Sequence, residues 1–420
     1  MCRSLVSFVA PDTQAVVNKF LMDNMTTDNA VAEAIMRGNF DEARVRLQNG
    51  EPLSGRYAEN NKSQILNSIL RTKAFDLVDK LIEHGLVATD VYEYDNLDRS
   101  VFRNIALSLQ SDEDSIAFLH DLMKKIQNKN DEVKDLTLLG FCMEEGADPA
   151  IIRCLIEEGC DVQYKNNADM NLIHTVVRKN MLDTGKGTAY IELLLSQGVD
   201  VNHRHVEGTT PLMLAVQQGK TAYIGLLLQH GADPNEQDNK GKSAFYHAVT
   251  GQRNKALYDQ LREYAAPDFE AADRDGEYLL TSYLRMGGGS SQEELALLLQ
   301  MIRDGADIYQ SSPYYGQPKS GVDWLAEKAP ETLKAVLATG AIDITRGDDQ
   351  GNTILHKVCA YNVNYEQDVA KKIYQKVKIL LEAGADPERS NDKDETPLML
   401  ASKDNLKIKT VELLMQHKSK

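Results

Sequence analysis

Apolar residues recur along this chain in short blocks with helical spacing, and a glycine follows each block. In the clearest stretch, Leu212 and Ala215 make one narrow apolar face, and Gly219 follows where a tight turn would begin. The run 226–228 is three leucines, which give a wider apolar face, and Gly231 stands where a left-handed residue can end a helix. The pattern predicts two antiparallel helices, each with a face that must be covered.

This two-helix pattern repeats along the chain, and its start and end carry recurrent phrases. Thr-Pro-Leu opens the unit: the threonine hydroxyl can cap a helix, and a proline in the first turn loses no hydrogen bond. This phrase stands at 210–212 and 396–398, with looser copies at 243–245 and 353–355. A leucine-rich phrase with glycine and aspartate closes the second helix, at 155–161, 193–200, 226–234 and 380–387. Because neither helix buries its face alone, the units are predicted to stack and share a core.

These phrases resemble the ankyrin repeat, a unit of about 33 residues with a Thr-Pro-Leu-His-x-Ala phrase. The resemblance is strongest over 195–240 and 345–417. It implies an all-α ankyrin-like solenoid of about ten stacked helix-turn-helix units with short β-hairpin or turn connections. We expect an irregular N-terminal cap over 1–29, degenerate repeats over 30–168, and repeats with loop insertions and a Lys-rich C-terminal cap over 169–420.

The spacing departs from the regular period in four places, near 180–187, 287–291, 309–320 and 360–372. Insertions in a solenoid map to loops, which often carry function. Two of them contain glycine clusters, at 185–187 and 287–289, that lack the strand-loop-helix setting of a phosphate loop. We interpret both clusters as flexible linkers.

Composition narrows the class of protein. The chain is 42% hydrophobic and 26% charged, as in folded soluble proteins, and its formal net charge of -16 disfavours nucleic acid as a partner. The last 50 residues differ, with eleven Lys or Arg against eight Asp or Glu. No apolar run approaches the roughly 20 residues of a membrane span. The apolar patch within residues 1–10 is too short for a secretory signal. Five cysteines without a C-x-x-C pair suit a reducing compartment. We therefore expect a cytoplasmic protein without membrane insertion, monomeric on its own.

The strongest candidate for contact with a partner is an aromatic stretch, residues 245–324, which holds eleven of the 27 aromatic residues. Tyrosine and tryptophan dominate interface hot spots because they offer large contact areas at low entropic cost. Tyr314 and Tyr315 lie in an insertion where a hairpin tip is expected, so we predict that both face solvent and anchor a partner. Phe245 and Trp324 are expected in the core.

The resemblance also implies a row of partner-binding residues, because ankyrin partners usually lie against hairpin tips and first helices. Carried onto this sequence, the row comprises Val206, Glu207, Thr209, Gln217, Gln218, Asn239, Lys240, Lys242, Asp349, Gln350, Asn352 and Tyr361.

Candidate chemistry elsewhere is weak. His203 and His205 stand close together, but two ligands without a third do not make a metal site. The resemblance assigns His174 and His356 a structural hydrogen-bonding role at helix starts. No nucleophile elbow or phosphate loop is found, so we predict no catalytic residue, no metal and no cofactor.

The sequence therefore favours a non-enzymatic protein–protein interaction module, a scaffold, adaptor or inhibitor, that binds an unidentified protein through a preorganised surface. Two alternatives stay open. One is a microbial effector or immunity-type protein that targets another cell's protein. The other is an enzyme whose site lies in residues 1–130, where the repeat is hardest to recognise.

Overall fold

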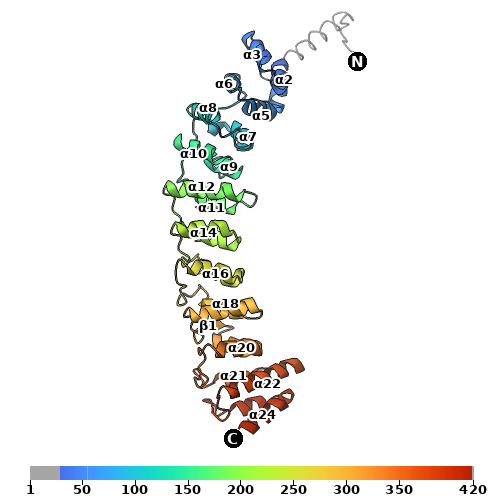
Figure 1. Cartoon of the computed structure of the whole chain (residues 1–420), viewed down its shortest axis with the longest axis vertical. Helices are drawn as coiled ribbons and strands as arrows, with labels where there is room; N and C mark the ends of the chain where they lie inside the picture. The colour runs from blue at the N-terminus through green and yellow to red at the C-terminus, as the bar shows by residue number, and fades with distance from the viewer. Residues whose placement is uncertain (1–28, 54, 419–420) are drawn as a thin grey trace, which may run out of the picture. The chain divides into compact units, whose positions relative to one another are not determined.

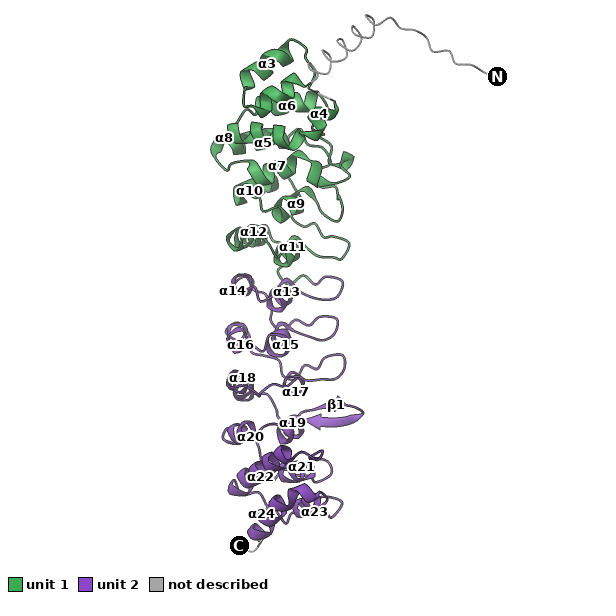
Figure 2. Ribbon diagram, turned by 90° about the vertical axis from the view of Figure 1, so that its right-hand side faces the viewer, with its two compact units in different colours: residues 1–203 green, residues 204–420 purple. Residues whose placement is uncertain are grey.

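The structure, a computed structural model, describes residues 29–53 and 55–418 and divides the chain into two compact units. Unit 1 comprises residues 1–203 and unit 2 residues 204–420 (Figure 2). The cap predicted over 1–29 lies outside the described residues, apart from Asn29, which precedes the first described helix.

The described part of unit 1 is helical, with five pairs in chain order (Figure 1). Its elements are α2 (Ala30–Met36), α3 (Phe40–Gln48), α4 (Arg56–Asn60), α5 (Lys62–Thr72), α6 (Asp76–Glu83), η1 (Val91–Glu93), η2 (Leu97–Arg99), α7 (Val101–Ser108), α8 (Glu113–Met123), α9 (Leu138–Glu144), α10 (Pro149–Glu157), α11 (Leu172–Arg178) and α12 (Thr184–Ser196). The first helices α2, α5, α7, α9 and α11 contact one another in turn, and so do the second helices α8, α10 and α12. The pairs therefore share a continuous core, as the repeat predicts.

Unit 2 continues the same plan with six pairs and one short sheet. Its elements are α13 (Pro211–Gln217), α14 (Thr221–Gln229), α15 (Ala244–Tyr246), the π-helical turn η3 (His247–Gly251), α16 (Lys255–Arg262), α17 (Leu279–Arg285), α18 (Gln292–Arg303), β1 (Ser311–Tyr314), β2 (Gln317–Ser320), α19 (Gly321–Glu327), α20 (Pro330–Leu337), α21 (Ile354–Ala360), α22 (Gln367–Glu382), α23 (Pro397–Ser402), η4 (Asn405–Lys407) and α24 (Ile408–Lys418). Second helices α14, α16, α18, α20, α22 and α24 contact one another in sequence. Figure 2 shows the turns of this unit projecting on the side of the first helices.

The Thr-Pro phrase starts helices as predicted. Thr210 caps α13 by accepting a hydrogen bond from Met213 N at 3.3 Å, and Pro211 occupies the first turn. Thr396 does the same for α23, with Pro397 after it. Both caps satisfy an amide that the helix leaves without a partner.

In unit 1 other residues take over the roles of the missing phrase. Ser100 caps α7 and Thr137 caps α9. Between α5 and α7, the buried amide of Asn104 donates to Ser63 Oγ and Asn67 Oδ1, each at 2.9 Å. A polar contact thus joins neighbouring repeats where the consensus has decayed.

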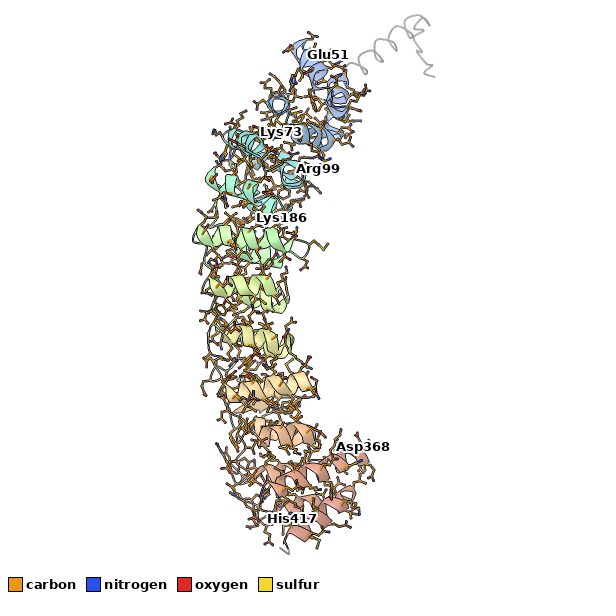
Figure 3. All side chains as sticks on the ribbon, in the orientation of Figure 1. Glu51, Lys73, Arg99, Lys186, Asp368 and His417 are labelled. Carbon is orange, nitrogen blue, oxygen red and sulfur yellow. The ribbon has the colours of Figure 1, made fainter. Side chains whose placement is uncertain are left out.

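Two of the predicted loop insertions are loops only in part, because each also lengthens a helix. Residues 185–187 lie in the first turn of α12, where Asp183 accepts from Lys186 N at 2.9 Å, so a cap overrides the poor helix propensity of glycine. The insertion near 360–372 lengthens α22 to 16 residues, and Asp368 lies in its first turn (Figure 3). The insertion near 309–320 forms the only two-stranded sheet among the described residues.

None of the helices in the described part of the chain is long and apolar enough to cross a membrane.

Two buried lysines hold the last repeats together. Lys376 of α22 donates to Ala326 O in the last turn of α19, and Lys407 donates to Cys359 O in the last turn of α21 at 2.8 Å. Each ammonium meets carbonyls that a helix leaves unpaired, at the negative end of its dipole. Burial lowers the pKa of both, that of Lys376 to about 8.

The depressed pKa of Lys376 predicts a pH-dependent effect of the Lys376→Met substitution. Above about pH 8 the folded chain has released this proton while the unfolded chain still holds it, so the cost of burying the lysine falls as pH rises toward the unfolded pKa of 10.5. The stability of the methionine variant relative to wild type should therefore fall by about 1–2 kcal/mol between about pH 7.5 and pH 9.5. Urea unfolding of both proteins at both pH values measures the difference, and taking the difference removes the opposite titration of the buried cysteine thiols. A constant difference between the two proteins would contradict the burial argument.

Candidate partner-binding surface

Five turns of unit 2, here called tips, lie next to the first helices: 204–208, 238–242, 273–277, 346–352 and 391–395 (Figure 2). Backbone hydrogen bonds join neighbouring tips. Asn239 N donates to Glu207 O at 2.9 Å, Arg274 N to Lys240 O at 3.0 Å, and Asp392 N to Gln350 O at 3.0 Å. The tips therefore form a ladder that fixes the spacing of their exposed side chains.

Glycine permits this close approach. Gly208 and Gly241 have φ of +81° and +77°, in the left-handed region. A Cβ at Gly208 would lie 2.6 Å from Asn239 N, and one at Gly241 would lie 2.7 Å from Asp273 Cα. The tips stack at a distance that leaves no room for a side chain at these two positions.

The structure places most of the predicted row on this surface. Val206, Glu207, Gln217, Gln218, Asn239, Lys240, Asp349 and Gln350 are exposed, and Lys242, Asn352 and Tyr361 are half-buried. For Thr209 the prediction is wrong, because this residue is only 7% exposed. Thr209 directly precedes the helix cap, where the chain turns inward.

Between the 273–277 and 346–352 tips, a hairpin replaces the usual turn. β1 and β2 pair antiparallel with Tyr314 opposite Gln317, and the loop residues Tyr315 and Gly316 both have positive φ, 47° and 76°. Two successive residues with positive φ are the signature of a type I′ turn, which matches the twist of a hairpin.

Proline protects both edges of this hairpin. Pro313 and Pro318 face each other in the register. At this position of the register the backbone N–H groups of both strands would point outward, away from the partner strand. Because proline has no N–H group, each edge of the hairpin lacks a hydrogen-bond donor there. The hairpin is thus a poor template for adding another strand.

The two tyrosines of the hairpin differ. Tyr315 is 90% exposed at the tip, as predicted. Tyr314 is half-buried. The centroid of its ring lies 4.9 Å from the ring centroid of Trp324 and 4.9 Å from Lys319 Nζ. The prediction that Tyr314 projects into solvent is therefore wrong, while Trp324, at 8% exposure, is buried as expected.

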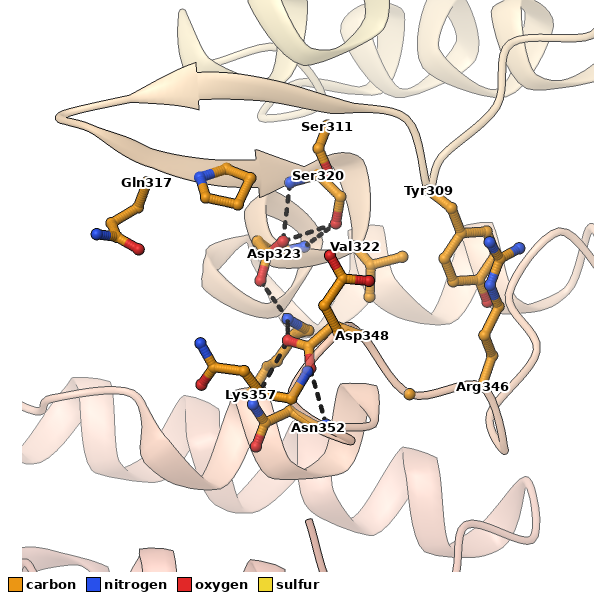
Figure 4. A pocket seen from close by; sticks show the side chains of 14 residues that line it. Tyr309, Ser311, Gln317, Ser320, Val322, Asp323, Arg346, Asp348, Asn352 and Lys357 are labelled. Carbon is orange, nitrogen blue, oxygen red and sulfur yellow. Dashed lines mark hydrogen bonds and ion pairs between the residues drawn. The ribbon is translucent and has the colours of Figure 1, made fainter. Parts of the chain in front are cut away.

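A groove opens beside the hairpin, formed by two adjoining hollows, of which Figure 4 shows the first. The hollows share Gln317, Pro318, Asp323 and Lys357. β2 lines one side, and the other is lined by the 346–352 tip and by Tyr361 at the end of α21. Their volumes are about 210 and 330 Å³, near or below the lower end of the roughly 300–1,000 Å³ typical of small-molecule sites. The dimensions suit protein side chains better than a cofactor.

Lys357 forms the floor of this groove. Its Nζ donates to Asp323 Oδ1 at 2.6 Å and to Asp348 Oδ2 at 2.5 Å, and its side chain is 15% exposed (Figure 4). Burial opposes its charge, but the two carboxylates outweigh that cost and raise the pKa of Lys357. Burial likewise opposes the charge of Asp348, yet Lys357 and two backbone amides hold its pKa below the ordinary value. The cluster joins α19, α21 and the 346–352 tip through charge-assisted hydrogen bonds.

The groove brings together five predicted residues from two repeats, Tyr314, Asp349, Gln350, Asn352 and Tyr361. Val206, Glu207, Gln217, Gln218, Asn239, Lys240 and Lys242 lie on earlier tips and helices of the same unit, outside its lining. Sequence reasoning missed Lys319, Asp323, Arg346 and Lys357. No phrase of the repeat marks them, although the hairpin insertion pointed to the right repeat.

His203 and His205, the candidate metal ligands of the sequence, are engaged in hydrogen bonds. Among residues 29–53 and 55–418, no group of three or more His, Cys, Asp or Glu side chains could hold a metal ion. His203 Nε2 instead contacts Asp169 O at 2.7 Å, and His205 Nδ1 accepts from Glu207 N at 3.0 Å. Cys154, Cys160 and Cys359 are buried, which raises the pKa of each thiol to about 12 and leaves it a poor nucleophile.

The two histidines expected at helix starts are buried there. His174 Nδ1 lies 2.8 Å from Asn171 Oδ1, and His356 Nδ1 lies 2.8 Å from Thr353 Oγ1. Burial lowers the pKa of His356, which favours the neutral ring in this structural role.

Comparison with known proteins gives the family. Residues 185–266 match the family described as ankyrin repeats (3 copies). The chain therefore contains ankyrin repeats in this segment. Among solved structures, the ankyrin repeat domain of Bcl-3, described as a unique member of the IkappaB protein family, aligns at 23% identity and a TM-score of 0.45. The alignment covers 57% of this chain and 96% of that domain. No curated protein matches the sequence significantly.

The hairpin and its groove lie in a later part of the chain than the matched residues 185–266. The stacked first helices and tips of unit 2 nonetheless follow one plan through the last repeat, with Thr-Pro caps at both Thr210 and Thr396.

Proposed function

We propose that this protein is a non-enzymatic interaction module that binds a protein partner through the tips, the hairpin and the first helices of unit 2. One observation carries the proposal. Tyr314, Tyr361 and polar side chains of the 346–352 tip line a groove whose framework is already fixed by internal hydrogen bonds and ion pairs, and the hairpin beside it exposes Tyr315. A framework ordered before binding loses little entropy when a partner docks.

The surroundings of the groove support protein as the partner. Exposed tyrosine beside half-buried polar groups is the composition of interface hot spots. The net charge of -16 disfavours a phosphate backbone. The buried, unpaired thiols of Cys142, Cys154, Cys160 and Cys359 suit action in the reducing cytoplasm, and we propose that the chain acts there as a monomer.

A catalytic role is less well supported. The alternative hypothesis is an enzyme with its active site in residues 1–130. The described part of this region consists of the helical pairs α2–α3, α5–α6 and α7–α8. Their facing surfaces are filled by apolar side chains such as Ile69, Phe102 and Leu119. No observation favours the effector or immunity-type alternative over a resident scaffold, adaptor or inhibitor.

The two tyrosines of the hairpin provide the test. We expect Tyr315→Ala to weaken binding of a captured partner by about 2 kcal/mol with an unchanged melting temperature, because the ring touches little of its own protein. Tyr314→Ala should weaken binding and also destabilise the fold by about 1–2 kcal/mol, because it uncovers Trp324.

The measurement uses the full chain as bait in a lysate, identifies the retained protein by mass spectrometry, and compares its dissociation constants with wild type and both variants. Met181→Ala, at a residue 92% exposed in unit 1, is the matched control for an exposed apolar side chain. Equal affinity of Tyr315→Ala and wild type would remove the hairpin from the binding surface.

A further inference from the structure

The groove beside the hairpin owes its opening to a break in the ladder of tips. Other neighbouring tips are joined by amide-to-carbonyl bonds of 2.9–3.0 Å, as between Asn239 and Glu207. Between β2 and the 346–352 tip, all of which the structure describes, no backbone hydrogen bond is made. In the other ladder bonds the later tip donates to a carbonyl of the earlier one, and no amide of the 346–352 tip donates to β2. Side-chain contacts such as the ion pair of Lys357 with Asp323 join the repeats at this place instead.

The groove carries an excess of negative charge. On its floor, Lys357 is shared by two carboxylates, so the cluster with Asp323 and Asp348 has a net charge of one negative unit. On its rim, Asp349 is exposed. Arg346, whose guanidinium lies 3.9 Å from the ring centroid of Tyr309, and the ion pair of Lys319 with Glu327 complete the lining, which carries four carboxylates against three cations. The next tip, 391–395, adds the exposed carboxylates of Asp392 and Asp394, with the exposed Lys393 between them. Such a field attracts cations and repels anions.

The same groove already holds a cationic side chain from its own chain. Lys319 Nζ lies 3.4 Å from the ring centroid of Trp324 and 4.9 Å from that of Tyr314, and forms an ion pair with Glu327 Oε1 at 2.5 Å. Aromatic faces closed by a carboxylate bind ammonium and guanidinium groups, since the rings contribute a cation–π attraction and the carboxylate a charge-assisted hydrogen bond. Tyr361, half-buried, lines this hollow beside them.

From these contacts we infer that the groove takes an extended, basic segment of the partner protein. One arginine or lysine reaches the rim carboxylate of Asp349, and another packs against Tyr361. Glu327 is already paired with Lys319, and Lys376 Nζ lies 5.6 Å from the ring centroid of Tyr361, so Asp349 provides the free carboxylate of the site. The Pro318 edge lacks a donor at the opening, so side chains and not strand pairing provide the recognition. This inference rests on the proposed function and specifies the chemistry of the partner.

The test needs no identified partner. A fluorescein-labelled peptide in which arginines alternate with glycine and serine is titrated with the full chain, and fluorescence anisotropy gives its dissociation constant. The matched probe replaces each arginine with citrulline, which has nearly the same shape but no charge. We expect the arginine peptide to bind at least roughly tenfold more tightly at physiological salt.

Variants locate the binding. Asp349→Asn should weaken the arginine peptide roughly threefold and Tyr361→Ala roughly fivefold, with little effect on the citrulline peptide. Glu331→Gln removes an exposed carboxylate from α20, a second helix outside the groove, and should leave the affinity unchanged. Melting temperatures confirm that each variant is folded.

Equal binding of the two peptides would overturn the inference, and so would equal losses from Asp349→Asn and Glu331→Gln, which would indicate attraction to the whole acidic chain. Neither result would affect the proposed function, which fails instead if Tyr315→Ala leaves binding of the captured partner intact.

Discussion

Gly241→Ala lowers the free energy of unfolding by about 3–4 kcal/mol, one of the largest effects that we expect from one methyl group in unit 2. The residue has φ of +77°, which alone costs an L side chain about 1–2 kcal/mol. In addition, the new Cβ would lie 2.7 Å from Asp273 Cα and 3.1 Å from Arg274 N, both backbone atoms of the next tip. Relief requires the tips to separate, which breaks the bond from Arg274 N to Lys240 O.

Gly219→Ala separates the cost of backbone strain from the cost of a steric clash with the next tip. Gly219 also has a left-handed φ, +67°, but a Cβ there would meet no atom within 4 Å. Its substitution should cost only about 1–2 kcal/mol. Chemical unfolding gives both values, and hydrogen exchange at Arg274 reports the parted tips. If the two variants lose equal stability, the tips are not held together by close contact at Gly241.

Lys357→Met lowers the free energy of unfolding by about 2–3 kcal/mol. Removing the ammonium leaves Asp323 and Asp348, whose side chains are 24% and 34% exposed, without their shared partner. Loss of one partner from a fully buried ion pair costs about 3–5 kcal/mol, and the partial exposure of these carboxylates reduces that figure. Methionine nearly preserves the volume, so the effect reports charge more than packing.

The pH dependence of the Lys357→Met deficit identifies its cause. The pKa of Asp348 is depressed in the folded chain, so the stability it contributes is present above its unfolded pKa and is lost as pH falls through the folded value. The deficit of the variant should therefore shrink below about pH 4. Lys334→Met on α20, where the lysine is exposed, is the control and should change stability by less than about 0.5 kcal/mol. A deficit that stays constant down to low pH would assign the effect to packing.

The fold could be predicted because its signals are local. The caps of Thr210 and Thr396 and the terminating Gly231 depend on a few neighbouring residues, and the structure places all three as the pattern indicates. In contrast, an insertion shows only that residues are added. Whether they lengthen a helix, as in α12 and α22, or form a hairpin depends on caps such as Asp183 and on the next repeat.

The site was harder to predict because it depends on contacts between repeats. The position of Tyr314 is set by Trp324, ten residues later, and by the register of the hairpin. Lys357 reaches back 34 residues to Asp323, and neither residue belongs to a recurrent phrase. Enrichment in aromatic residues indicated the repeat that carries the hairpin but could not distinguish the exposed Tyr315 from rings such as Tyr258 and Tyr283, which fill the core.

Hydrogen–deuterium exchange of the full chain, alone and with its captured partner, tests the central claim most directly. We predict that the partner slows exchange at the hairpin, residues 311–320, and along the 346–352 tip, while the second helices α18 and α20 exchange unchanged. Protection confined to the second helices, or to unit 1, would contradict the assignment of the binding surface to the tips and groove of unit 2.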